Sequence, residues 1–576
     1  MRFELFYDLV AFLPSILAQT STCADPSGCR CVYGQYCWPS ERDFDSLSAQ
    51  LSVPLIRPIP PASACYPVGN PSGNCSDVQQ NWSNGIWRSD QPGAYEFSNF
   101  ETYTNSANGS VSGCYLNTTL GLPCEQGSVA PVGVDARTVG DVQAAVRFAG
   151  EYNLRLVVKN TGHDLLGRSA ARGAFMIWTH HLKNISYDAN FIPEGGSDYE
   201  TVPALTLGAG VQWKEAYAAA SEQQRYIMGG ISDDMSNGAA GGWVMGGGHG
   251  PLSPKYGLGV DNVVQFTIVT PNGDHVVANA YRHSDLFWAL RGGGAGSWGV
   301  VTSATYRTYD LVPLVLVSMN ATFPDSQAAQ RVTTELVRLQ PKLSDAGWGG
   351  FSSFNNVFLS LLFLAPDVSW AEVNTTILPF FNFVGDAAGP SNVEILTKPF
   401  DNFYAWLNTL TPSGLPQVGV NWELASRLMS RDMAENHTEE SAQLLLSFDF
   451  ISLVLVAGGV VGRADPDSVG LNPGWRKAAA LAVTVETWKE GASSSVVFEA
   501  RQRIAEYVRR LEPISPDSAT YMNEASLYEP DFRKSFFGSH YNRLRSIKRK
   551  YDPTSTFLVV EGVGSEDWNG DLTCPL

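Results

Sequence analysis

The chain has 576 residues and a mass of 62.5 kDa, more than one hydrophobic core usually organises, so two or more domains are expected. Hydrophobic residues make up 44% and charged residues 17%, a balance typical of globular proteins. The net charge of −18 would repel nucleic-acid phosphates. The one basic cluster, 543–550, lies in a helical pattern and is interpreted as a solvated helix face. We expect neither a nucleic-acid nor a membrane partner.

The N-terminus predicts a signal peptide over residues 1–18. An apolar run from Leu9 to Ala18 follows Arg2, is too short to span a bilayer and ends in a small residue. Eight N-x-S/T sequons favour glycosylation in the secretory pathway. They begin at Asn74, Asn81, Asn108, Asn117, Asn184, Asn320, Asn374 and Asn436. We therefore expect a secreted glycoprotein.

Cysteines are concentrated near the N-terminus. Eight of the nine lie between Cys23 and Cys124, an even number in a Pro/Gly/Ser-rich stretch, which predicts a disulfide-stapled segment over 19–124 and leaves Cys574 over. Their connectivity stays open. The run CRCVYGQYC, with Cys29, Cys31 and Cys37, is an alternative zinc site, but no histidine precedes His163, which disfavours it.

Helical and strand patterns alternate from about Val132. Thr138 and Asp141 predict a capping box for a helix, which is followed by a strand over 154–160 and the loop TGHDLLGRS. A strand from Ala204 leads to a helix over 213–223, and residues 261–279 predict a β-hairpin. The segment 284–309 predicts a helix, a glycine turn and a strand. We assign this domain to 125–310.

The glycine density falls from Leu311, where strand-like and helical runs mix. This pattern predicts a separate α+β domain over 311–516. The last segment, 517–576, contains its own helix, ended by Asp552-Pro553. The predicted fold class is α+β.

Two glycine-rich stretches follow strands, at 160–169 and 238–250. Such turns let backbone N–H groups approach a pyrophosphate without obstruction by Cβ atoms, so both are suited to a dinucleotide. A third, Gly294 to Gly299, fits the pattern G-x-G-x-x-G. It follows a helix and opens a strand, the reverse of a Rossmann context, so we do not interpret it as a Rossmann site.

Four long motifs occur in order between Cys124 and Trp568: VVKNTGHDLLGRS, GGGHGPLSPKYGLGVDNVV, SDLFWALRGGGAGSWGVVT and YMNE…FFGSHYNRLRSIKRKYDP. Together they resemble the berberine-bridge-enzyme branch of the vanillyl-alcohol-oxidase superfamily. Within it, the chain is most similar to fungal secreted or secondary-metabolite FAD-linked oxidoreductases, including isoamyl alcohol oxidases. The resemblance implies a two-lobed FAD-binding domain of the p-cresol methylhydroxylase (PCMH) type, a substrate domain covering the flavin, and a C-terminal segment that returns to the FAD domain.

The resemblance also implies the residues around the cofactor. His163 would bond to the flavin 8α-methyl carbon, within a pyrophosphate loop formed by Asn160, Thr161, Gly162, Asp164, Gly167 and Arg168. The second glycine-rich wall would comprise Gly229, Gly230, Gly242, Gly246, Gly248, His249 and Gly250. Other positions implied to flank or face the flavin are Asp261, Asn262, Val301, Tyr521 and Asn523.

One departure concerns the number of flavin attachments. Many relatives use a second bond, from a cysteine shortly before the second glycine-rich wall. This chain has GGISDDMSNGAAGG there, with Asp234 or Met235 at the approximate position, and no cysteine between Cys124 and Cys574. We predict a single covalent link of FAD, through His163.

The catalytic base stays open. Flavin oxidation requires an acceptor for the substrate's hydroxyl or amine proton. Some plant relatives use a glutamate of the substrate domain, but the nearest stretch here, 457–477, has no acid before Asp465. Glu524, Tyr521 and Tyr528 are alternatives, none of them favoured. His249 is interpreted equally well as a flavin-site or a structural histidine.

We expect an oxidase that passes a hydride from an alcohol, a sugar or a biosynthetic intermediate to FAD and then to molecular oxygen, giving hydrogen peroxide. The alternatives are a dehydrogenase with another acceptor and a secreted ligand-binding protein without turnover. A metal-dependent hydrolase is disfavoured because no H-E-x-x-H motif occurs. His180 and His181 are disfavoured as a metal pair because adjacent strand residues face opposite sides. The substrate and oligomeric state stay open.

Overall fold

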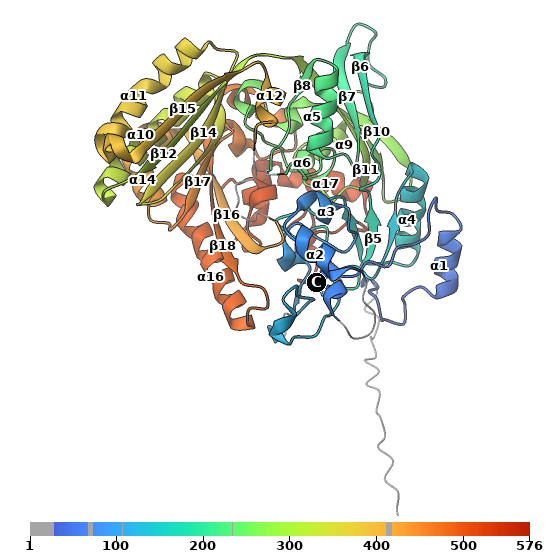
Figure 1. Ribbon diagram of the computed structural model, residues 1–576. Coiled ribbons are helices and arrows are strands. Elements are labelled where there is room, and N and C mark those ends of the chain that lie inside the picture. Colours follow the sequence, from blue (N-terminus) through green and yellow to red (C-terminus); the bar gives the residue numbers. More distant parts are fainter. Residues whose placement is uncertain (1–27, 67–72, 106–107, 233, 411–417) are drawn as a thin grey trace, which may run out of the picture.

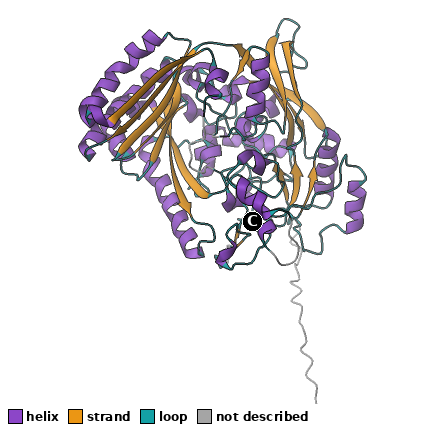
Figure 2. Cartoon of the chain, viewed as in Figure 1, coloured by secondary structure: helices purple, strands orange, loops and turns teal. Residues whose placement is uncertain are grey.

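The computed structural model describes residues 28–66, 73–105, 108–232, 234–410 and 418–576. The predicted signal peptide, 1–18, and Cys23 lie outside the described residues. Two large antiparallel sheets stand on opposite sides of the molecule, and helices and loops fill the space between them (Figures 1 and 2). The predicted mixture of helices and sheets in an α+β fold is confirmed.

The first lobe of the N-terminal half is a small parallel sheet with the order β3-β5-β4. Its strands are β3 (Val132–Asp135), β5 (Phe175–Trp178) and β4 (Leu156–Lys159). Helix α4 (Val139–Glu151) packs on this sheet through Phe148, and α1 (Glu41–Ser48) adds Phe44 to the same core. The predicted capping box begins α4: the Asp141 amide donates to Thr138 Oγ1 at 3.2 Å.

The second lobe is a six-stranded antiparallel sheet in which β8 also pairs with β11, and its path is β10-β9-β11-β7-β6. The predicted hairpin is its β9–β10 pair, in which Val269 faces His275. The strands are β6 (Ile185–Phe191), β7 (Val202–Gly208), β8 (Arg225–Ile227), β9 (Val263–Val269), β10 (His275–Asn279) and β11 (Val300–Asp310). The associated helices are α5 (Trp213–Glu222) and α9 (Ser284–Leu290).

The third unit is a seven-stranded antiparallel sheet with the order β15-β12-β14-β13-β17-β18-β16. The strands are β12 (Leu314–Thr322), β13 (Gly349–Phe354), β14 (Phe358–Pro366), β15 (Val393–Phe400), β16 (Asn421–Ser430), β17 (Ile451–Leu455) and β18 (Ala478–Trp488). Its outer helices are α10 (Ser326–Asp345), α11 (Trp370–Ala388), α13 (Arg431–Asn436), α14 (Thr438–Leu445) and α16 (Ser494–Leu511).

Alternation along β12 explains how this sheet joins the rest of the molecule. Val315 and Val317 belong to the core beneath the outer helices, whereas Leu314 and Leu316 belong to or pack against the core of the second lobe. Successive side chains of a strand point to opposite faces, so each face packs against a different layer. The inner face therefore lies toward the centre of the molecule.

The remaining short elements lie mainly between these sheets. Figure 1 places α2 (Cys75–Asn81) and α3 (Gly85–Ser89) between β16 and β5, and Phe97 forms a bridge with Val420 just before β16. The others are α6 (Gly242–Met245), α7 (Ser253–Tyr256), α8 (Gly259–Asn262), α12 (Phe403–Leu407), α15 (Gly459–Arg463), α17 (Tyr541–Tyr551) and the pair β1 (Tyr103–Thr104) and β2 (Val111–Ser112).

The basic cluster on α17 is only partly the predicted solvated face. Arg549 and Lys550 are exposed, but Lys548 is buried. Its ammonium contacts Asp552 Oδ2 at 2.5 Å and donates to the carbonyl oxygens of Ser297 and Phe557, both at 2.7 Å. The cation is buried because these oxygens replace its water. In the described ranges, no helix is both long and apolar enough to cross a membrane.

The disulfides differ from the predicted N-terminal cluster. Cys574, which was left over, pairs with Cys29 and joins the two ends of the described chain. The other pairs are Cys31–Cys37, Cys65–Cys75 and Cys114–Cys124. Because Cys29, Cys31 and Cys37 are all disulfide-bonded, the zinc interpretation of CRCVYGQYC is wrong. An even count in one segment could not reveal a partner 545 residues away.

Breaking Cys29–Cys574 should destabilise the protein more than breaking a local disulfide. Loop entropy predicts a loss of about 6 kcal/mol for a link across 545 residues, against about 3 kcal/mol for Cys65–Cys75, which spans 10. We expect the Cys29→Ser/Cys574→Ser variant to lose its fold at a lower temperature than Cys65→Ser/Cys75→Ser. Thermal half-lives compare the two, and peptide mapping without reduction should recover the Cys29–Cys574 link. Equal half-lives would contradict the prediction.

Candidate active site

One cavity lies where three distant stretches of the chain meet. It is lined by the loop after β4, by the glycine-rich wall around α6, and by residues 521–524 of the C-terminal segment. Its lining combines glycine backbone with polar side chains such as Asn160 and Arg168 and apolar ones such as Leu166 and Val301. Small-molecule sites typically have such a wall, in which a few polar groups fix the orientation of the ligand.

The loop after β4 is shaped by its own side chains. Asp164 accepts from the amides of Leu166 at 3.2 Å and Ser169 at 2.6 Å, which closes the loop on itself. Gly162 has φ +83°, a conformation that strains other residues, and its carbonyl accepts from the Glu96 amide at 3.1 Å. The loop therefore presents His163 from a fixed backbone.

His163 lies against Phe97 of the N-terminal segment, with ring centroids 5.4 Å apart. Its Nδ1 is buried and has no hydrogen-bond partner among the described residues. Burial lowers the pKa of His163, although the carboxylates of Asp234, Glu524 and Asp164 act in the opposite direction. The ring is thus favoured in its neutral form, in which one nitrogen keeps a free electron pair.

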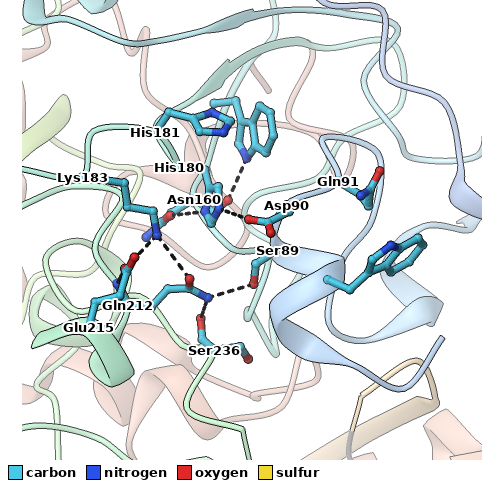
Figure 3. Close-up of polar contacts among 12 residues, drawn as sticks. Ser89, Asp90, Gln91, Asn160, His180, His181, Lys183, Gln212, Glu215 and Ser236 are labelled. Carbon is cyan, nitrogen blue, oxygen red and sulfur yellow. Dashed lines mark hydrogen bonds and ion pairs between the residues drawn. The ribbon is translucent and has the colours of Figure 1, made fainter. Parts of the chain in front are cut away.

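Polar contacts behind the loop fix Asn160, as Figure 3 shows. Its Nδ2 donates to the Ala209 carbonyl at 2.8 Å, and its own carbonyl accepts from Trp178 Nε1 at 2.9 Å. His180 lies between Asn160 and Asp90, 3.3 Å from Asn160 Oδ1 and 2.7 Å from Asp90 Oδ1. This network ties the loop to α3 of the N-terminal segment.

His180 and His181 do not lie on the strand that the sequence predicted. Both follow the end of β5 and lie in a turn, not on a strand. His180 contacts Asp90, whereas His181 Nδ1 lies 2.7 Å from Asp135 Oδ1. Among the residues that the structure describes, no group of three or more His, Cys, Asp or Glu side chains could hold a metal ion.

Glycines make the second wall thin. A Cβ on Gly250 would lie 1.9 Å from the Gly229 carbonyl oxygen, and one on Gly246 would lie 2.1 Å from Asn523 Oδ1. These positions are glycine because neighbouring groups occupy the Cβ space. At Gly241 and Gly242 a Cβ would meet nothing within 4 Å, and both glycines line the cavity. Backbone there is open to a ligand.

Most of the predicted cofactor residues come together around this cavity. Those that line it are Asn160, Thr161, Gly162, His163, Asp164, Arg168, Gly230, Gly242, His249, Gly250, Val301 and Asn523. Those that do not line it are Gly167, Gly229, Gly246, Gly248, Asp261 and Asn262. The glycines of this second group lie within or beside the walls, where they permit close packing.

Asp261 and Asn262 support the site through other residues. Asp261 forms a two-pronged ion pair with Arg476, at 2.7 and 2.9 Å, which joins α8 to the segment before β18. Asn262 donates to the carbonyl oxygens of Tyr256 and Leu258, at 2.9 and 2.7 Å, and accepts from the Tyr309 hydroxyl at 2.6 Å. Both side chains are therefore engaged by protein groups.

Sequence reasoning missed several residues of the cavity. Ala295, Gly296 and Gly299 line it, so the G-x-G-x-x-G turn, which is not a Rossmann turn, nevertheless belongs to the site. The high glycine content of this turn was the sequence feature that could have indicated a place in the site. Phe351 of β13, the cavity's contact from the seven-stranded sheet, and Phe557 and Val559 near the C-terminus also line it. No local pattern distinguishes these from other apolar residues.

Only some of the candidate catalytic bases line the cavity. Tyr521 and Glu524 line the cavity, whereas Tyr528 does not, and Asp465 begins an exposed 3₁₀ turn. Burial raises the pKa of Tyr521 well above its usual range, with Glu524 adding to the effect. His249 also lines the cavity, with Nε2 3.0 Å from Glu524 Oε1. His249 therefore belongs to the site, and the raised pKa of Tyr521 keeps its phenol protonated.

The residues present fit an FAD. Arg168 is the cation on the cavity wall, and in the described part of the chain no carboxylate lies at ion-pair distance from it. Its guanidinium donates to the carbonyls of Val560 and Glu561, at 3.2 and 3.4 Å. Ser169 Oγ is buried without a partner, as is His163 Nδ1. An anionic dinucleotide would supply partners for these groups.

Comparisons with known proteins agree with this geometry. A family profile described as "FAD binding domain" matches residues 131–279, and one described as "Berberine and berberine like" matches 520–564. An uncharacterized FAD-linked oxidoreductase of Arthroderma benhamiae is 35% identical over 98% of each chain. The VAO-type flavoprotein oxidase VAO615 of Thermothelomyces thermophilus is 31% identical, covering 95% of this chain and 94% of its own.

Solved structures give the same relationship. The VAO-type flavoprotein MtVAO615 from Myceliophthora thermophila superposes with a TM-score of 0.85 at 29% identity, covering 95% of this chain and all of that one. MtVAO713 from the same organism has a TM-score of 0.84 at 25% identity, covering 94% and 98% of the two chains. The chain therefore belongs to the berberine-bridge-enzyme-like branch of the vanillyl-alcohol-oxidase superfamily and is an FAD-linked oxidoreductase.

Proposed function

We propose that this protein is a secreted oxidase that holds FAD through one covalent bond to His163. It removes a hydride from a small organic substrate, an alcohol, a sugar or a biosynthetic intermediate, and passes the electrons to molecular oxygen. The observation that carries the proposal is the position of His163 on the cavity wall, with a buried and unpartnered nitrogen. FAD, when bound, supplies the two-electron chemistry.

A single tether is supported by the state of the cysteines. Each of the eight described cysteines belongs to a disulfide, so none offers a thiol for a second bond. Asp234, near the position where relatives carry a cysteine, accepts from the Gly85 amide at 2.7 Å and from the Ser236 amide at 3.0 Å. These contacts hold the loop against α3.

The oxidase assignment is supported by the name of one relative, the flavoprotein oxidase of Thermothelomyces thermophilus. Another relative, 32% identical, is the flavin-dependent oxygenase ucdF of Aspergillus ustus, so the use of oxygen is a recurring theme among these names. Secretion is supported by four disulfides, which persist in oxidising compartments. Six of the eight sequon asparagines are exposed and none is buried.

Replacing His163 should abolish covalent attachment of the flavin. We expect wild-type protein precipitated with acid to stay yellow, because a covalent bond survives loss of the fold, and His163→Ala to give a colourless pellet with free FAD. The absorbance of pellet and supernatant measures the distribution. His437→Ala, which changes a half-exposed histidine of the outer helices, should retain a yellow pellet. A yellow His163→Ala pellet would rule out this tether.

Covalent attachment should persist below the ordinary titration range of histidine. Because burial lowers the pKa of His163, its ring stays neutral at pH values where a free imidazole takes up a proton. An unperturbed histidine would be only about one quarter neutral at pH 6. We expect apoprotein supplied with FAD to lose less than fourfold in the rate of covalent adduct formation between pH 7.5 and pH 6. A fourfold slower reaction at pH 6 would contradict the lowered pKa.

Substrate oxidation should yield one hydrogen peroxide per turnover. The test is a peroxide-coupled screen of alcohols, sugars and metabolites, combined with stopped-flow flavin reduction without oxygen. Flavin reduction with no peroxide under air would assign a dehydrogenase with another acceptor. Absence of reduction by the whole panel, despite tight binding of a member, would favour a ligand-binding protein without turnover.

A further inference from the structure

Few side chains on the cavity wall are able to accept a proton. Among the described lining residues, the carboxylates are Asp164 and Glu524, and the imidazoles are His163 and His249. Asp164 uses both oxygens to hold backbone amides of its own loop. His163 is the residue assigned to the flavin bond. This leaves Glu524 and His249, which contact each other.

Glu524 has one oxygen held and one free. Its Oε1 lies 3.0 Å from His249 Nε2, and no hydrogen-bond partner of Oε2 occurs in the ranges described. The side chain is 29% exposed, whereas His249 is 8% exposed. Since a carboxylate only accepts hydrogen bonds, the proton of this contact is on Nε2. The imidazole donates to Glu524 and leaves Oε2 available to the cavity.

Contacts with neighbouring residues fix the position of His249 and of its ring. Its carbonyl accepts from Trp243 Nε1 at 3.2 Å, and its ring lies 4.8 Å from the Tyr521 ring in an edge-to-face arrangement. Gly250, the next residue, packs against the Gly229 carbonyl too closely for any Cβ. The imidazole therefore fixes the direction of the carboxylate from the FAD side of the cavity.

The backbone of Glu524 is held from the opposite side. Its carbonyl accepts a short hydrogen bond from Ser426 Oγ of β16, and Ser426 Oγ also lies 2.6 Å from Thr520 Oγ1. Ser426 is fully buried in the seven-stranded sheet. Glu524 is thus positioned by both the FAD-binding part and the sheet that contributes Phe351 to the cavity.

We infer that Glu524 is the proton acceptor of the reaction and that His249 is its positioning residue. The inference rests on the proposed function. The O–H bond of an alcohol substrate breaks and its proton passes to Glu524 Oε2. The adjacent C–H bond breaks with its electron pair, which leaves as hydride to the FAD, and a C=O bond forms. Glu524 releases its proton to solvent before the next turnover.

The experiment compares Glu524→Gln, Glu524→Asp and Tyr521→Phe with the wild type. The probe is the alcohol of the panel above that reduces the wild-type flavin fastest. We expect Glu524→Gln to bind FAD covalently but to be reduced about 10²–10⁴-fold more slowly, the range for loss of a general base. Glu524→Asp should recover at least tenfold of this loss. Glu499→Gln, the same change at an exposed position of α16, should react like the wild type.

A second measurement needs no substrate. Glu524→Gln removes a carboxylate from the cavity wall, so the visible flavin spectrum of the oxidised variant should differ from that of the wild type at the same pH, whereas the spectrum of Glu499→Gln should not. His249→Asn should slow flavin reduction without weakening substrate binding, because the ring no longer fixes the direction of the carboxylate. A merely structural histidine would not affect the reduction rate separately from substrate binding.

The outcomes separate this inference from the function on which it rests. If no panel alcohol reduces the wild type, the oxidase proposal fails and the role of Glu524 fails with it. If the wild type is reduced and Glu524→Gln is reduced at least one fifth as fast, only the role of Glu524 is overturned. A hundredfold loss in Tyr521→Phe with a small loss in Glu524→Gln would instead assign the phenol.

Discussion

Two hydrogen bonds from Asn523 Nδ2, each 3.1 Å long, bind the C-terminal segment to the carbonyl oxygens of Gly242 and Trp243. They form because Gly246 has no Cβ, which would occupy the position of the amide. Tyr521 and Glu524 lie on either side of Asn523, so their places in the cavity depend on this contact. The site therefore forms only when the C-terminal segment around Asn523 packs against the glycine-rich wall at Gly242 and Trp243.

The position of the cavity also depends on contacts between the FAD-binding lobes and the seven-stranded sheet. The Asp261–Arg476 ion pair and the contact of Ser426 with the Glu524 carbonyl both cross this boundary. A charged pair buried to this degree costs desolvation, which is offset only when the geometry is close to ideal. Its two short contacts meet that condition, and they hold the sheet at a fixed distance from the cavity.

Local patterns predicted the elements well. The Thr138–Asp141 capping box, the β9–β10 hairpin and the helix that ends before Asp552-Pro553 each depend on neighbours in sequence, and each is present. The family motifs also located His163, His249 and Asn523 on the cavity wall. These positions were predictable because glycine-rich backbone and its flanking polar residues form long, recognisable runs.

Features that depend on distant partners were not predictable. Phe351 alternates like any strand residue, and only the packing of two sheets turns it toward the cavity. The Glu524–His249 contact joins residues 275 positions apart. The sequence around either residue does not indicate that the other lies nearby. Lys548 looked like part of an exposed basic face because its burial depends on the Ser297 carbonyl, 251 positions earlier, and on how the chain after the helix folds back to bring Asp552 and Phe557 to it.

The Cys29–Cys574 link has a consequence for biosynthesis. Cys29 is synthesised 545 residues before its partner, whereas Cys31 has its own partner only six residues away. Throughout elongation Cys29 must therefore remain a thiol or be released from a wrong pairing by thiol–disulfide exchange. A chain that stops before Cys574 is unable to form this disulfide and keeps an unpaired thiol at Cys29.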